Sequence, residues 1–264
     1  MKHLAIPSMS VQGNGKPYTC PGLGDRVHTA TLAYRYGHAS ADAVTIHLTA
    51  DKMNRDKPES WLAILGLFPS NVLTIRGHPV EGLSNRDWVA YLKANGFTDA
   101  ECYYYADLYG MHPAEDVFPL DISRYIKESP RLEPGKNLWA DFQPMLPAGR
   151  YATVHWESGG DPLRDQRRVT YEMQQRIEER YRAEGLELVT VGGEAEQPLL
   201  RSSLRHVGCA MAHAECHAGI DSGPMHLAAL YLPFDRLHIY SAGARSHHVR
   251  RWVANGAKLN RYAA

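Results

Sequence analysis

Short apolar segments with the composition of β-strands alternate with helix-like segments on both sides of a proline-rich stretch, and this alternation constrains the fold most strongly. The strands expected in the first half are 3–6, 43–48, 71–75 and 101–105, and the helices are 26–36 and 86–94. The strands expected in the second half are 151–155, 187–191, 216–220 and 237–240, and the helices are 169–184, 198–212 and 225–231. This pattern predicts an α/β protein with two doubly wound sheets that face each other across a cleft.

The stretch 116–149 separates these two halves. It contains five prolines, too many for a regular element, so we expect a linker with one short helix at 122–127. The chain is therefore divided into a Rossmann-like N-terminal domain (1–118), a proline-rich linker (119–149) and a Rossmann-like C-terminal domain (150–264). Ligands bind outside the carboxyl ends of parallel strands, so function is expected at the turns from strand to helix.

Composition excludes several classes of protein. The chain has 264 residues, 44% of them hydrophobic, and a formal net charge of +0, which favours a folded protein with no general affinity for nucleic acid or membrane. The first ten residues make a poor signal peptide, and no apolar run approaches the length of a membrane span. The four cysteines show no C-x-x-C pairing. We expect a cytoplasmic protein with reduced thiols and no integral membrane segment.

Charge is uneven only near the C-terminus. Six cations and no Asp or Glu lie between Arg236 and the end of the chain. This segment is either a solvated basic surface or a rim that attracts a phosphorylated donor or a polyanionic acceptor.

The turn that starts at Asp221 shows the strongest local signal. A buried strand ends there, and Asp221 or Ser222 is placed to cap the next helix. The free amides of Gly223 and Met225, together with the positive end of the helix, predict a site for an anion. His226 in the first turn can donate a hydrogen bond to the same anion. The alternative is an ordinary capped helix with a half-buried histidine.

Residues 221–229, Asp-Ser-Gly-Pro-Met-His-Leu-Ala-Ala, resemble the donor-binding motif of glycosyltransferase family 9, the ADP-heptose:lipopolysaccharide heptosyltransferase family. In that family this strand, loop and helix hold the diphosphate of the nucleotide sugar. The resemblance implies a compact GT-B fold, in which the C-terminal domain binds the nucleotide-sugar donor and the N-terminal domain lies on the acceptor side.

A second turn supports the resemblance. The strand before Gly192, Gly193 and Glu194 is similar to the family's strand that ends in two glycines and an acidic residue beside the nucleotide. Glycines at such a turn let the backbone approach a ligand closely. The feature alone identifies no ligand, because most Rossmann-like sheets have such turns.

The turn after 151–155 is the third candidate. In the resembled family it supplies small hydroxyl residues and a basic side chain to the donor phosphates, which implies these roles for Ser158 and for Arg167 or Arg168. Arginine suits phosphate because its fork bonds two oxygens. Trp156 and Glu157 depart from the family pattern, so the group that touches phosphate stays open, and a solvated helix start is the alternative.

Near the N-terminus, Gly22-Leu23-Gly24-Asp25 forms a glycine loop that leads into a helix and resembles the family's Gly-x-Gly-Asp loop. The resemblance implies that Asp25 is the catalytic general base, which takes the proton of the acceptor hydroxyl, and that Gly24 lies beside the donor. The alternative is that Asp25 only caps the helix. Residues 8–20 are inserted before this loop, either as a flap over donor or acceptor or as a longer turn.

No metal or cofactor is expected. The sequence has no H-E-x-x-H and no carboxylates at ligand spacing. We therefore predict an inverting, metal-independent glycosyltransferase (a hexosyl- or heptosyltransferase) with a nucleotide-diphosphate sugar as donor and a glycan, a lipopolysaccharide-type molecule or a modified nucleic acid as acceptor. The alternatives are a nucleotide-sugar epimerase or hydrolase of the same fold, and a non-catalytic nucleotide-sugar binding protein.

Overall fold

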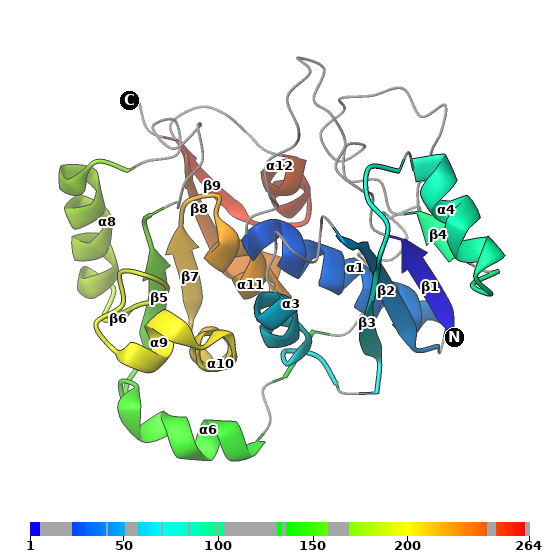
Figure 1. Ribbon diagram of the computed structural model, residues 1–264. Helices are drawn as coiled ribbons and strands as arrows, with labels where there is room; N and C mark the ends of the chain where they lie inside the picture. Colours follow the sequence, from blue (N-terminus) through cyan, green and yellow to red (C-terminus); the bar gives the residue numbers. More distant parts are fainter. Residues whose placement is uncertain are drawn as a thin grey trace. The chain divides into compact units, whose positions relative to one another are not determined.

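The computed structural model divides into two compact units, Met1–Pro130 and Arg131–Ala264. The structure describes residues 1–5, 23–40, 42–50, 58–69, 71–83, 85–98, 100–102, 131–133, 136–157, 169–241 and 247–261 (Figure 1).

The first unit is built on a parallel sheet of four strands, in the order β3-β2-β1-β4. The strands are β1 (Lys2–Ala5), β2 (Val44–Thr49), β3 (Leu73–His78) and β4 (Ala100–Cys102). The described helices are α1 (Leu23–Ser40), α3 (Pro58–Leu65) and α4 (Asn85–Ala94).

The two faces of this sheet differ in chemistry. Helix α1 lies against the apolar face, where Gly37 approaches Val44 so closely that a Cβ would lie 2.8 Å from its Cγ2. The opposite face contains Ala5 and histidines, and Trp88 and Leu92 of α4 cover it. A strand buried along its whole length, such as β2, therefore separates an apolar layer from a polar one.

The second unit has a parallel sheet of five strands, in the order β6-β5-β7-β8-β9. The strands are β5 (Tyr151–His155), β6 (Glu187–Thr190), β7 (Cys216–Gly219), β8 (Leu237–Ser241) and β9 (Lys258–Arg261). The described helices are α6 (Lys136–Phe142), η2 (Gln143–Met145), α8 (Tyr171–Ala183), α9 (Pro198–Ser202), α10 (Leu204–His213), α11 (Gly223–Tyr231), η3 (Phe234–Arg236) and α12 (His247–Ala254).

Helix α8 covers one face of the second sheet, and α10 and α11 cover the other (Figure 1). Ile177 and Tyr181 of α8 pack on Val154 and Ala218 of the strands. On the opposite face α10 and α11 touch directly, because a Cβ at Gly208 would lie 2.7 Å from the Tyr231 ring.

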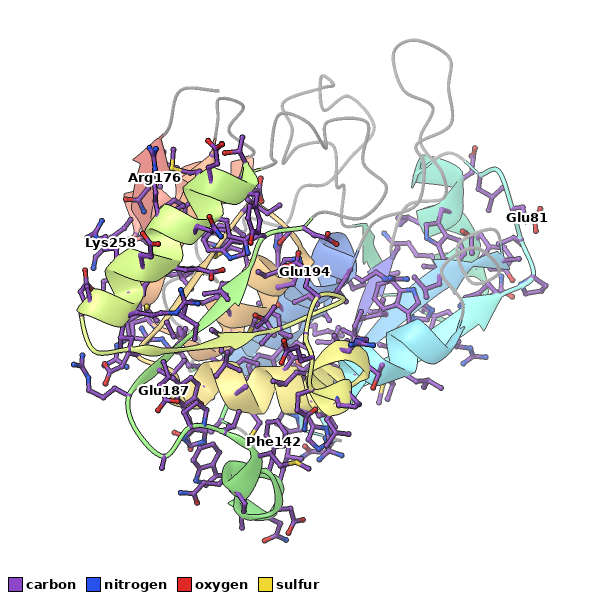
Figure 2. All side chains as sticks on the ribbon, turned by 90° about the vertical axis from the view of Figure 1, so that its left-hand side faces the viewer. Glu81, Phe142, Arg176, Glu187, Glu194 and Lys258 are labelled. Atoms are coloured by element: carbon purple, nitrogen blue, oxygen red, sulfur yellow. The ribbon has the colours of Figure 1, made fainter. Side chains whose placement is uncertain are left out.

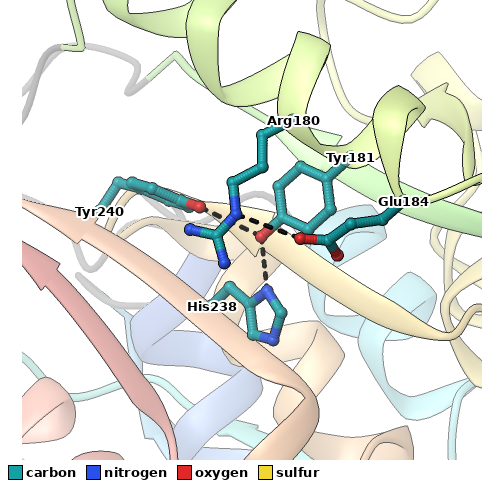
Figure 3. Close-up of polar contacts among 5 residues, drawn as sticks. All are labelled: Arg180, Tyr181, Glu184, His238 and Tyr240. Carbon is teal, nitrogen blue, oxygen red and sulfur yellow. Dashed lines mark hydrogen bonds and ion pairs between the residues drawn. The ribbon is translucent and has the colours of Figure 1, made fainter.

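A polar cluster joins α8 to the sheet at β8 (Figure 3). The Tyr181 hydroxyl hydrogen-bonds His238 Nδ1 and lies 3.1 Å from the Tyr240 hydroxyl. On the surface beside it, Arg180 and Glu184 form an ion pair of 3.1 Å. The buried hydroxyl groups are thus satisfied by each other and by an imidazole.

The prediction of α/β halves with parallel sheets is confirmed. The expectation that no regular element lies in the proline-rich stretch outside 122–127 is wrong, because α6 and η2 occupy 136–145. Pro144 stands in the first turn of η2, where a missing N–H costs nothing. The helix expected at 122–127 lies outside the described residues. Within the described ranges, no helix has the length and apolar character needed to cross a membrane.

Candidate functional site

Three turns of the second unit leave the same edge of its sheet. Strands β5, β6 and β7 are parallel, so their carboxyl ends lie together. His155 is the last residue of β5, and the turns after β6 and β7 contain Gly192, Glu194 and Asp221. The end of β5, the turn after β6 and the start of α11 meet at Gly192, where an added Cβ would lie 2.9 Å from His155 Nδ1 and 3.7 Å from Pro224 Cγ.

Two glycines permit this close approach. Gly192 has φ +86°, a left-handed conformation that favours glycine. An added Cβ at Gly219, the last residue of β7, would lie 2.5 Å from the carbonyl oxygen of His155. The predicted role of Gly192 was close approach to a ligand; the structure shows a second role, close approach to His155.

His155 links β5 to the turn after β6. Its Nδ1 lies 2.9 Å from the carbonyl oxygen of Val191, which can only accept, so Nδ1 carries the proton. Burial lowers the pKa of His155, and hydrogen bonds with the backbone of Val191 and Glu157 oppose this shift. His155 was not among the predicted site residues; its place at the last position of a strand before a polar turn was the available signal.

The start of α11 differs in part from the expectation. Ser222 is the N-cap, but its hydroxyl makes no capping bond and donates instead to the Ile220 carbonyl, at 3.3 Å. The amides of Met225 and His226 donate to the Ser222 carbonyl at 3.1 and 3.3 Å. The prediction of a free Met225 amide is therefore wrong, because the first turn closes on itself. The Gly223 amide is the first of this helix and has no acceptor within it.

The predicted anion-binding side chains at this turn are buried. Asp221 is 5% exposed and His226 is 7% exposed. The His226 ring packs edge-on against Trp252 of α12, with ring centroids 4.7 Å apart. His226 thus joins α11 to α12, and its contact with an anion stays a prediction.

Glu194, after β6, has the most unusual carboxyl group of the site (Figure 2). Burial raises its pKa to about 7, the Glu157 and Glu178 carboxylates add to this, and backbone hydrogen bonds from Trp156 and Glu157 oppose it. Its Oε1 is buried without a hydrogen-bond partner. Near neutral pH this carboxyl can therefore donate a hydrogen bond as well as accept one.

Trp156 belongs to the core and explains one departure from the family pattern. Its side chain is 3% exposed and packs among the residues between α8 and the sheet. Its indole Nε1 donates to Glu178 Oε1 at 3.1 Å. Glu157, the next residue, is exposed. The chain therefore turns from core to surface between these two positions.

Several predicted site residues are not among the described residues at this edge of the second sheet. Ser158, Arg167 and Arg168 lie outside the described residues. Gly24 and Asp25 belong to the first turn of α1 in the first unit, where Gly24 is buried and the Asp25 side chain is not described. Across the described ranges, no group of three or more His, Cys, Asp or Glu side chains is arranged to hold a metal ion.

Comparison with known proteins identifies the architecture. No family model and no curated protein matches the sequence. A solved structure of E. coli ADP-heptose lps heptosyltransferase II is similar, with 15% identity, a TM-score of 0.53, and coverage of 99% of this chain and 90% of that chain. The glycosyl transferase family 9 protein from Veillonella parvula gives 11% identity, a TM-score of 0.55, and coverage of 100% and 86%. The structure of E. coli heptosyltransferase WaaC with ADP has 13% identity and a TM-score of 0.51, and the match covers 99% of this chain and 93% of that chain. The chain has the fold of these glycosyltransferases.

Proposed function

We propose that this chain is an inverting, metal-independent glycosyltransferase that moves a sugar from a nucleotide-diphosphate donor to an acceptor hydroxyl. The observation that carries the proposal is the meeting of the end of β5, the turn after β6 and the start of α11 at one edge of the second sheet, in a chain with a glycosyltransferase fold. One of the similar structures was determined with ADP. A nucleoside diphosphate is therefore the ligand class proposed for this edge.

The start of α11 is the proposed binding site of the diphosphate. The N-terminal end of a helix presents partial positive charge and unbonded amides to an anion. Ser222 and Gly223 are half-buried rather than buried, so this end of the helix is partly open. Arg167 or Arg168 is proposed to add the cationic charge, and Glu194 to bond the nucleoside at the neighbouring turn.

The chemistry follows from where charge develops. As the bond from the anomeric carbon to the diphosphate breaks, negative charge grows on the diphosphate oxygens, and the helix end and an arginine stabilise it without a metal. On the first unit, Asp25 is the proposed base that takes the proton of the attacking hydroxyl. Attack from the face opposite the leaving group inverts the anomeric carbon.

A donor screen tests this proposal. The full chain is incubated in excess chelator with ADP-, GDP- and UDP-sugars, with and without glycan and lipopolysaccharide acceptors, and nucleoside diphosphate release and glycosylated product are measured. Release coupled to a glycosylated acceptor is expected. Release with free sugar alone would indicate a hydrolase, and binding without release would indicate a binding protein; either result contradicts the proposal.

The role of Asp25 has its own test. Asp25→Asn keeps the size of the side chain in the first turn of α1 but removes the proton-accepting carboxylate. We expect turnover to fall about 10²–10⁴-fold, the usual contribution of a general base, with donor affinity and melting temperature unchanged. Normal turnover in the folded variant would exclude Asp25 as the base.

A further inference from the structure

Three histidines form a hydrogen-bonded row across the sheet of the first unit. His3 on β1, His47 on β2 and His78 on β3 share one face, because the register places His47 level with Ala5 and His78 level with Thr49. His3 Nδ1 lies 3.1 Å from His47 Nε2, and His47 Nδ1 lies 2.8 Å from His78 Nε2. His47 is thus bonded to a neighbouring imidazole through both of its ring nitrogens.

Proton counting limits what this row can hold. Each contact between two ring nitrogens is a hydrogen bond only when it contains one proton, because two N–H groups or two lone pairs repel each other. Three neutral imidazoles bring three protons, so two fill the contacts and the third lies on an outer nitrogen, of His3 or of His78. One added proton occupies the other outer nitrogen and breaks neither contact. A second added proton has to break one.

Aromatic side chains enclose the row. Phe97 packs against all three imidazoles, with ring centroids between 4.5 and 5.8 Å apart. Trp88 and Tyr91 of α4 pack edge-on against His78. These contacts fix the planes of the rings, so the hydrogen bonds between the imidazoles persist as part of the packed core.

Positive charge on a single ring of the row is unfavourable. Burial lowers the pKa of His47 to about 3, and the charges of His78, His3 and Arg76 act in the same direction. Burial and Arg76 also lower the pKa of His78. Outside the row, Arg76 on β3 acts on both His47 and His78, and Tyr91 on α4 packs against His78. Sharing one proton over connected rings spreads its charge.

We propose that His3, His47 and His78 act as one proton relay, a single site that binds one extra proton for all three rings and connects β1 to the carboxyl end of β3. Shifting all three rings to the other tautomer moves the third N–H from one outer nitrogen to the other, so a proton taken up at one end leaves at the other. His78 is the last residue of β3, at the edge of a parallel sheet where ligands bind. The relay is independent of the proposed transfer reaction.

Nuclear magnetic resonance on the full chain with nitrogen-15 histidine tests the relay in the unaltered protein. The ring nitrogen shifts are followed through the pH range in which histidine titrates, and nitrogen–nitrogen couplings across the two contacts are measured. The relay predicts both couplings and one common midpoint for the three rings, with uptake of one proton. Three separate midpoints without couplings would overturn it.

Substitution of the middle ring gives a second test with a matched control. His47→Phe keeps an aromatic ring but disconnects His3 from His78, so the remaining two histidines each take a proton and the uptake rises from one to two, with a lower midpoint for His78 beside Arg76. His3→Phe leaves one contact and keeps the uptake at one. Independent rings would give equal or smaller uptake in His47→Phe, which contradicts the relay. Should His47→Phe not fold, His3→Phe and the couplings of the unaltered chain decide.

Discussion

Replacing Gly192 by alanine tests whether the turns of the second unit meet as described. Gly192 has φ +86°, and an alanine Cβ would lie 2.9 Å from His155 Nδ1. A left-handed conformation costs a residue with a Cβ about 1–2 kcal/mol. Displacing His155 also loses its hydrogen bond to Val191, worth about 1 kcal/mol and more when the buried groups stay unbonded. Gly192→Ala should therefore lower the free energy of unfolding by about 2–4 kcal/mol.

The assay is urea unfolding followed by circular dichroism and tryptophan fluorescence. Gly193→Ala is the matched control, because a Cβ at this exposed glycine has nothing within 4 Å. We expect the control to change the free energy of unfolding by less than about 0.5 kcal/mol. Equal losses in the two variants, or no loss in Gly192→Ala, would refute the geometry of the turns.

Three other contacts of the second unit give further predictions. Burial lowers the pKa of His217 to about 3 and of His238 to about 4, so at these two sites the unfolded chain binds more protons below about pH 6.5, which lowers the free energy of unfolding by up to about 2.7 kcal/mol per pH unit. The raised pKa of Glu194 acts in the opposite direction, by up to about 1.4 kcal/mol per pH unit, so the free energy of unfolding should still fall as the pH drops from about 6.5. A pH-independent result in urea unfolding would contradict this. Tyr181→Phe removes a buried hydroxyl that makes two hydrogen bonds, and should lower the free energy of unfolding by about 1–3 kcal/mol in the same assay. Tyr171→Phe, at a 70% exposed position, should not change it measurably. Ser222→Ala should lower the free energy of unfolding by no more than about 1 kcal/mol, because the hydroxyl makes no capping bond and loses only its 3.3 Å hydrogen bond to the Ile220 carbonyl; a loss near 2 kcal/mol, about the upper end for a cap, would contradict the structure.

The sequence predicted the sheets well because their strands have a compositional signal. Strand β2 is buried along its length and contains β-branched residues, so it was found within one residue at each end. Strand β9 was missed, because it has Leu259 as its one large apolar residue and is held by pairing with β8. Helix α6 was missed because the prolines were counted over the whole stretch 116–149. Pro134 and Pro144 flank the helix, and no proline lies within it.

The candidate site could be predicted only as far as local order along the chain determines it. The turns at Gly192 and Asp221 were found because glycine and polar residues follow apolar strands. The contact of His155 with Gly192 depends on which strands are neighbours, and a single sequence does not give that order. The closing of the first turn of α11 on the Ser222 carbonyl is a backbone hydrogen-bond geometry, which the residue types along the chain do not determine.

A calorimetric titration of the full chain with nucleosides and nucleoside diphosphates, in excess chelator, tests the central claim most directly. The diphosphate is proposed to bind at the start of α11, so ADP, GDP or UDP should bind at least about tenfold more tightly than the matching nucleoside, a difference of about 1.4 kcal/mol in the free energy of binding. Binding at one site per chain is expected for that nucleotide. Equal affinity of each nucleoside and its diphosphate, or no binding of any of them without a divalent metal, would contradict the account.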